Sequence, residues 1–278
     1  MNAERFFASL WDDYTSIAPQ AARIREAFLA RGERVVNDHV AFRTLAAGPI
    51  GLERLERHLL DLGYRRYEPY DFSDKKLRAW GYLPADRGGG PLPRVFLSEL
   101  LVDELSPGAA AILRRLAESV DPARVESPDV LWAGRPWEPV SWEEYRILER
   151  ESEYAAWVAA LGFHANHFTI SVNHLGSPGS LPQVLDFVES LGIPINETGG
   201  RVKGSPDVLL EQGSTLADRI PVEFAGGDRH VVPTCYYEFA KRYPDADGRL
   251  FEGFVPASAT KIFSSTDRTL AEKAAASS

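Results

Sequence analysis

The chain has 278 residues, of which 44% are hydrophobic, and a formal net charge of −9 at pH 7. This apolar fraction is ordinary for a globular protein and can fill a sizeable core. The acidic balance argues against a dedicated nucleic-acid-binding protein, and the sequence has neither a bilayer-spanning apolar run nor a signal-peptide pattern. We therefore expect a soluble, cytoplasmic protein without a membrane or nucleic-acid partner. The single cysteine, Cys235, excludes an internal disulfide and a multi-cysteine zinc site, so nitrogen and oxygen must hold any metal.

The first half of the chain reads as helices followed by a strand–helix–strand module. Apolar residues at helical spacing, such as Phe7, Leu10 and Tyr14, predict N-terminal helices within residues 1–34. A first module over residues 35–120 begins with a strand, continues with a helix at about 51–62, and then has three strands and a helix. Residues 121–161 are predicted as a proline-rich linker and a helix, which begins at the capping-box pattern Ser141-Trp142-Glu143-Glu144.

The second half repeats this order. Three of the six histidines lie between Gly162 and His174, where β-branched and aromatic residues predict a strand. A helix at about 180–191 and several strands follow, so we place a second module at residues 162–263. Small polar residues predict a flexible tail at 264–278.

Two features indicate that the modules are internal repeats. Each first strand carries a histidine, His39 or His167, and each following helix ends in a Leu-Gly pair, at 62–63 or 191–192. The sequence therefore predicts an α+β fold. Two tandem βαβββ modules would form one curved mixed sheet, with added N-terminal and inter-module helices. If a pseudo-twofold axis relates the modules, the two histidines can converge in a shared cleft.

A third ligand could come from the last predicted strand. Glu238 lies there within an aromatic run, and two imidazoles with one carboxylate form the facial triad of non-haem iron(II) oxygenases. Other residues stay open as alternatives: His164 as a ligand or an outer partner, Glu99 and Glu223 as the carboxylate, and His230 as a substrate or outer contact. His58 and His174 are predicted to face solvent.

At these residues the sequence resembles the 2-oxoadipate dioxygenase/decarboxylase family of the vicinal oxygen chelate superfamily. The matching segments are residues 37–43, 165–169, 235–242 and 253–263, and the His-x-x-x-Arg element of the first is the most specific. The resemblance implies that His39, His167 and Glu238 hold Fe(2+), and that Arg43 binds a substrate carboxylate. It also implies conversion of 2-oxoadipate and O2 to 2-hydroxyglutarate and CO2, a step of lysine catabolism. A glyoxalase-type metal-dependent lyase or isomerase, and a metal-free binding protein of this fold, are the alternatives.

Overall fold

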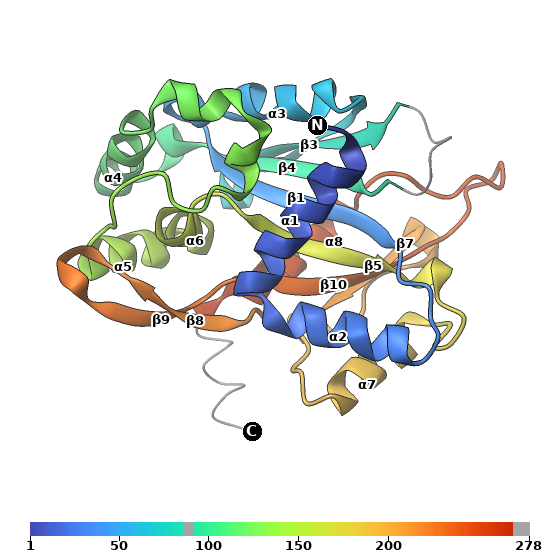
Figure 1. Cartoon of the computed structure of the whole chain (residues 1–278). Helices are drawn as coiled ribbons and strands as arrows, with labels where there is room; N and C mark the ends of the chain where they lie inside the picture. Colours follow the sequence, from blue (N-terminus) through green and yellow to red (C-terminus); the bar gives the residue numbers. More distant parts are fainter. Residues whose placement is uncertain (86–91, 269–278) are drawn as a thin grey trace.

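An eight-stranded mixed sheet organises the protein (Figure 1), which is described by a computed structural model over residues 1–85 and 92–268. The strand order is β2-β3-β4-β1-β5-β10-β7-β6, and β8 and β9 form a separate two-stranded ribbon. The strands are β1 (Asn37–Leu45), β2 (Tyr64–Phe72), β3 (Leu77–Pro84), β4 (Arg94–Leu100), β5 (Ala165–Ser171), β6 (Lys203–Ser205), β7 (Leu210–Ser214), β8 (Arg219–Glu223), β9 (Arg229–Pro233) and β10 (Tyr236–Arg242). The α-helices are α1 (Ala3–Ile17), α2 (Pro19–Ala30), α3 (Leu52–Asp61), α4 (Pro107–Glu118), α5 (Trp142–Glu151), α6 (Glu153–Leu161), α7 (Leu181–Ser190) and α8 (Pro256–Phe263).

The two halves of the sheet have equivalent strand orders on either side of its centre. β1 and β5 lie antiparallel side by side, β4 runs parallel to β1, and β10 runs parallel to β5. Reading outwards, β1-β4-β3-β2 corresponds to β5-β10-β7-β6, while α3 and α7 each follow the first strand of their half. The predicted fold of two βαβββ modules in one mixed sheet is thus confirmed. The β8–β9 ribbon is inserted between β7 and β10 in the sequence.

The two faces of the sheet are covered by different helices. On one face, Trp11 and Tyr14 of α1 pack against Phe168 of β5, with ring centroids 5.1 and 4.9 Å away. Successive strand residues point to opposite faces, so His167 points to the other side of the sheet. There α8 covers the strands, and Phe263 near its end approaches His167 and its neighbours. Figure 1 shows α1 crossing in front of the central strands with α8 behind them.

The segment between the modules is more ordered than a linker. Residues 121–140 contain two 3-10 turns, Pro122–Glu126 and Pro128–Trp132, which bury apolar side chains. The capping box at Ser141 is present, but the single helix predicted after it is two helices, α5 and α6. The break is at Ser152, whose side chain accepts a hydrogen bond from the Ala155 amide and begins the buried α6.

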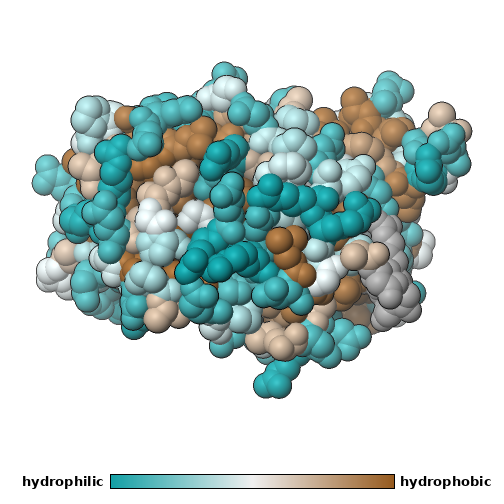
Figure 2. Space-filling model, turned by 90° about the horizontal axis from the view of Figure 1, so that it is seen from above, coloured by the Kyte–Doolittle hydropathy of each residue, from teal (hydrophilic) through white to brown (hydrophobic). Residues whose placement is uncertain are grey.

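The predicted tail also begins differently. Ser264–Thr266 forms a 3-10 turn, and Asn196 Nδ2 donates a 2.8 Å hydrogen bond to Ser265 Oγ, which is buried. Residues 269–278, the rest of that tail, lie outside the described residues. Within the described ranges, no helix combines the length and the apolar character needed to cross a bilayer. Seen from above, the surface is mainly hydrophilic with hydrophobic residues interspersed (Figure 2).

Candidate metal centre

Three neighbouring strands bring His39, His167 and Glu238 together on the face that α8 covers. The Nε2 atom of His39 lies 3.5 Å from Glu238 Oε1, and Nε2 of His167 lies 3.3 Å from Glu238 Oε2. One potential ligand atom from each residue falls within 4.8 Å of the other two. All three residues are buried, with exposed fractions of 1%, 4% and 1%. The structure therefore groups the three residues that the sequence had singled out as ligands.

Sheet register explains why residues so far apart in sequence meet. His39 of β1 is paired with Thr169 of β5, and Thr169 is paired with Glu238 of β10. Paired residues on adjacent strands point to the same face, so His39, Thr169 and Glu238 form one row across the sheet. His167 precedes Thr169 by two residues and shares its face. The rigid central strands thus fix all three side chains without a loop.

The donor set fits a divalent first-row metal ion. Glu238 Oε2 is buried and has no hydrogen-bond partner among the described residues, while Oε1 accepts a 2.6 Å bond from Gln212 Nε2. The Nδ1 atoms of the histidines lie 2.8 Å from Asp38 Oδ1 and 3.1 Å from Asn166 Oδ1. Carboxylate and amide oxygens accept hydrogen bonds, so each Nδ1 carries the proton and each Nε2 has a lone pair that can bind a metal. In the structure, His39 Nε2 accepts a 3.0 Å hydrogen bond from Thr169 Oγ1. Two imidazole nitrogens and one carboxylate suit iron, manganese and related ions.

The electrostatics keep the second histidine neutral. Burial, and then the neighbouring His39 and Arg43, hold the pKa of His167 well below its usual value. Burial also raises the pKa of Glu238, against the opposing effects of His39 and the Gln212 hydrogen bond. Since a buried carboxylate is costly without a cation, a bound metal would satisfy Glu238.

Arg43 lies on β1 beyond His39, in a buried polar cluster. Its guanidinium is 3.2 Å from Glu153 Oε2 and donates to Thr266 Oγ1 at 3.1 Å. It also stacks near the rings of Tyr154 and Trp157, 4.8 and 5.2 Å from their centroids. Arg43 does not line the small cavity beside the three candidate ligands. Its assignment to a substrate carboxylate stays a prediction.

That cavity, of about 20 Å³, is enclosed mainly by apolar side chains. Its lining residues are His39, Phe96, His167, Gln212, Glu238, Phe254, Ala259, Ile262 and Phe263. Phe96 occupies on β4 the place that Glu238 occupies on β10, because their strands pair in register with Ala41 and Thr169, two residues after each histidine. One module therefore supplies a carboxylate where the other supplies a hydrophobic wall.

The alternative ligands lie elsewhere. His164 Nδ1 is 2.8 Å from Asp13 Oδ2 on α1, Glu223 is exposed on β8, and His230 stacks on Trp142 at a centroid distance of 3.9 Å. The prediction that His58 faces solvent was wrong. Its Nε2 lies 2.8 Å from the carbonyl oxygen of Val125, within the packed turns after α4.

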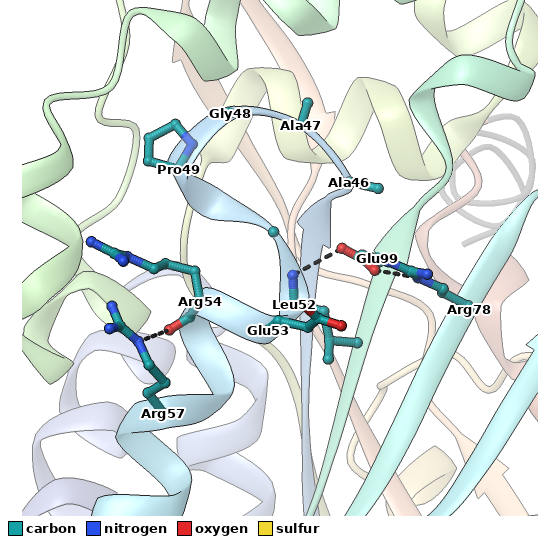
Figure 3. A pocket seen from close by; sticks show the side chains of 11 residues that line it. Ala46, Ala47, Gly48, Pro49, Leu52, Glu53, Arg54, Arg57, Arg78 and Glu99 are labelled. Atoms are coloured by element: carbon teal, nitrogen blue, oxygen red, sulfur yellow. Dashed lines mark hydrogen bonds and ion pairs between the residues drawn. The ribbon is translucent and has the colours of Figure 1, made fainter.

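The remaining carboxylate, Glu99, lies in the wall of a different pocket. This open hollow of about 690 Å³ surrounds the start of α3 and contains Arg54, Arg57 and Arg78 (Figure 3). Glu99 accepts hydrogen bonds from the backbone amide of Leu52, at 2.8 Å, and from Arg78 Nε. Glu99 therefore caps α3 and neutralises Arg78, so its carboxylate serves structure at a distance from the histidines.

Three polar neighbours of the candidate ligands were missed from sequence: Asp38, Asn166 and Gln212. A signal existed for two of them, because an Asp or Asn directly precedes each histidine in the repeat. Adjacent residues of a regular strand point to opposite faces, so this pattern does not by itself predict a contact with the histidine. Gln212 carries no such pattern, and only the pairing of β7 with β10 places it beside Glu238.

Two βαβββ modules whose first strands carry a facing pair of histidines define a vicinal oxygen chelate-type protein. The chain belongs to the 2-oxoadipate dioxygenase/decarboxylase family, whose model matches residues 12–249. The 2-oxoadipate dioxygenase/decarboxylase, chloroplastic/amyloplastic, of Oryza sativa subsp. japonica is 36% identical over 289 residues, covering 95% of this chain and 79% of the rice protein.

Solved structures of similar proteins share the fold. Hydroxyglutarate synthase from Oryza sativa, in complex with 2-oxoadipate, superposes with a TM-score of 0.90 and 35% identity, covering 96% of this chain and 94% of that one. A protein from Shewanella frigidimarina NCIMB 400, described as a candidate hydrolase, gives a TM-score of 0.86 and 42% identity, with coverages of 92% and 98%. The fold is therefore shared along almost the whole chain.

Proposed function

We propose that this enzyme is an iron(II)-dependent oxygenase that converts 2-oxoadipate and O2 to 2-hydroxyglutarate and CO2. The observation that carries the proposal is the buried group of His39, His167 and Glu238, whose donor atoms fit such a metal. Family membership and the binding of 2-oxoadipate by the rice hydroxyglutarate synthase support the substrate.

The atoms of this reaction balance. The carboxylate next to the keto group leaves as CO2, and the keto carbon becomes the new carboxylate by gaining one oxygen atom of O2. The other oxygen atom becomes the hydroxyl group on the adjacent carbon. The six-carbon diacid is thereby shortened to a five-carbon hydroxy diacid without a second organic substrate.

Each part of the site has a role in this reaction. His39, His167 and Glu238 would hold iron(II), which when bound supplies the redox chemistry and the open positions for a chelating 2-oxo acid and dioxygen. Phe96, Phe254 and other apolar wall residues would exclude water from the reacting carbons.

Arg43 is proposed to bind a substrate carboxylate. A guanidinium can grip a carboxylate through two parallel hydrogen bonds. Glu153 occupies one side of that guanidinium, at 3.2 Å. Binding would therefore require the substrate carboxylate either to share Arg43 with Glu153 or to replace it.

The test is the stoichiometry of oxygen consumed and CO2 released by iron(II)-loaded protein with a panel of 2-oxo acids. We expect one O2 and one CO2 per 2-oxoadipate, and no turnover without oxygen. Oxygen-independent turnover would instead favour a glyoxalase-type lyase or isomerase, or a hydrolase. Failure to bind any divalent metal would favour a metal-free binding protein.

Iron as the resident metal, a place in lysine catabolism and a cytoplasmic location are finer parts of the proposal. Metal analysis of protein purified without added ions tests the first. Accumulation of 2-oxoadipate in cells that lack the gene and are fed lysine tests the second, and fractionation of cells tests the third. The rice relative is described as chloroplastic/amyloplastic.

A further inference from the structure

The two histidines of the candidate metal centre are oriented by unlike neighbours. His39 Nδ1 is 2.8 Å from the carboxylate of Asp38, and His167 Nδ1 is 3.1 Å from the amide oxygen of Asn166. The two neighbours occupy equivalent places in the repeat, directly before each histidine. A hydrogen bond to a carboxylate is roughly twice as strong as one to a neutral amide. His39 is thus oriented by a carboxylate, and His167 by a neutral amide.

Asp38 is itself held by Arg242, and Arg94 lies nearby. Arg242 Nε donates to Asp38 Oδ2 at 2.8 Å, and Arg242 Nη2 donates to Asp38 Oδ1 at 2.9 Å. Arg94 Nη1 lies 3.3 Å from Asp38 Oδ2 on the other side. Two hydrogen bonds from one guanidinium fix the orientation of the carboxylate.

The rest of Arg242 is tied to the segment between β10 and α8. Its Nη1 donates to the carbonyl oxygens of Phe251 and Gly253, at 3.0 and 2.7 Å. Arg242 is 2% exposed and Asp38 is 3% exposed. A buried, bidentate arginine–carboxylate pair is rigid, because separating the partners would leave two buried charges unpaired.

We propose that Asp38 is a positioning residue for the metal centre: held by the bidentate Arg242, it fixes His39 in the Nδ1–H tautomer with Nε2 aimed at the metal. This inference rests on the proposed function, because it assumes that His39 binds a metal. It goes beyond that function in assigning to one half of the pseudo-symmetric site a charged anchor that the other half lacks. Carboxylate–histidine–metal arrangements raise the basicity of the ligand and fix its ring.

Cobalt(II) is a suitable probe, because its visible spectrum reports ligand geometry in the absence of turnover. In Asp38→Asn we expect the Co(II) dissociation constant to be roughly 10–100-fold larger, as for loss of other hydrogen-bond partners of metal ligands. The visible absorption bands of the bound Co(II) should also shift. Arg94→Gln is the matched control, since it removes charge from the same cluster and leaves both the Arg242–Asp38 pair and the Asp38–His39 hydrogen bond. This variant should lower the melting temperature of the apoprotein while binding Co(II) within about threefold of wild type.

The outcomes separate the two proposals. Equal losses of Co(II) affinity in Asp38→Asn and Arg94→Gln, or an unshifted Asp38→Asn spectrum, would overturn the positioning role and leave the metal centre intact. Failure of wild-type protein to bind Co(II) would overturn the metal centre itself.

A measurement on wild-type apoprotein keeps the inference testable if Asp38→Asn does not fold. Nitrogen-15 NMR of histidine-labelled protein distinguishes the two tautomers, and His39→Gln assigns the signal. We expect the Nδ1–H tautomer of His39, because Nδ1 faces the Asp38 carboxylate. A proton on Nε2 would contradict the proposal.

Discussion

At the residue scale, the candidate centre consists of three potential metal ligands, and a hydrogen bond with a neighbouring side chain orients each of them. Asp38 and Asn166 accept from the histidines, and Gln212 donates to Glu238. Pre-oriented donors lose little freedom on binding a metal, and buried polar atoms without partners cost roughly 1–3 kcal/mol each. The unpartnered Glu238 Oε2 therefore marks where a cation belongs.

Removal of one of the three candidate ligands should strongly weaken metal binding. We expect His167→Ala to weaken Co(II) or Fe(II) binding by more than about 100-fold and to stop oxygen consumption, because two protein ligands hold these ions poorly. His164→Ala is the control, since His164 contacts Asp13 on the far side of the strand. Calorimetric titration of both variants makes the comparison. Metal loss in His164→Ala with retention in His167→Ala would reverse the assignment.

Asp218 should make stability depend on pH. Burial raises its pKa from 3.8 to about 6, against a 3.0 Å hydrogen bond from the Gln20 amide. Its folded pKa exceeds its unfolded one, so the protonated form favours folding. This contribution is complete below about pH 4 and is lost as pH rises through about 6.

The variant Asp218→Asn removes that titration and keeps an acceptor for Gln20. Relative to wild type, we expect it to gain on the order of 1–2 kcal/mol of unfolding free energy between pH 4 and pH 7, after allowance for partial exposure. Urea unfolding at several pH values measures the difference. A difference that stays constant with pH would show that Asp218 is not shifted.

At the element scale, α8 covers the cavity beside the candidate metal ligands. Ala259, Ile262 and Phe263 of this helix close a cavity of about 20 Å³, which is room for roughly one water molecule. A six-carbon diacid needs several times that space. Binding of 2-oxoadipate should therefore require α8 or its neighbouring segment to shift.

Amide hydrogen exchange tests this requirement. Addition of 2-oxoadipate to metal-loaded protein should change exchange in α8 by at least roughly threefold, because its contacts with the cavity must rearrange. The control is α3, which packs beside an unrelated pocket and should exchange at the same rate with and without the acid. Unchanged exchange in α8 would indicate that the acid enters by another route.

At the scale of the whole molecule, the candidate centre joins the two modules. His39 comes from the first module, whereas His167 and Glu238 come from the second, and β1 and β5 meet at the centre of the sheet. A ligand that binds only the folded state stabilises it by mass action. Metal binding should therefore stabilise both modules together.

Thermal unfolding with added Co(II) tests this link. At a free Co(II) concentration about 100 times the dissociation constant, wild-type protein should gain about 2.7 kcal/mol of unfolding free energy in a single transition. His167→Ala should gain little. Two transitions, of which the metal moves one, would show that the modules unfold separately.

Local structure and the internal repeat could be predicted without the fold. Hydrophobic periodicity and capping patterns depend on neighbours in the chain, so the helices, the strands and the equivalence of His39 and His167 could be inferred from them. The facial-triad pattern suggested Glu238 as the third ligand, and the family resemblance supported it. The break at Ser152 and the buried His58 were not predicted, since both depend on packing against distant segments.

Which carboxylate joins the histidines, and which residues surround them, depends on how the strands pair in the folded chain. Glu99, Glu223 and Glu238 all lie on strands, and sheet register alone places Glu238 opposite Thr169, in the row that contains His39. Likewise, Asp38 looks like an ordinary strand residue until Arg242, from the last strand of the other module, grips it. Register and burial join residues that are far apart in the chain, and these contacts turn two similar strands into one asymmetric site.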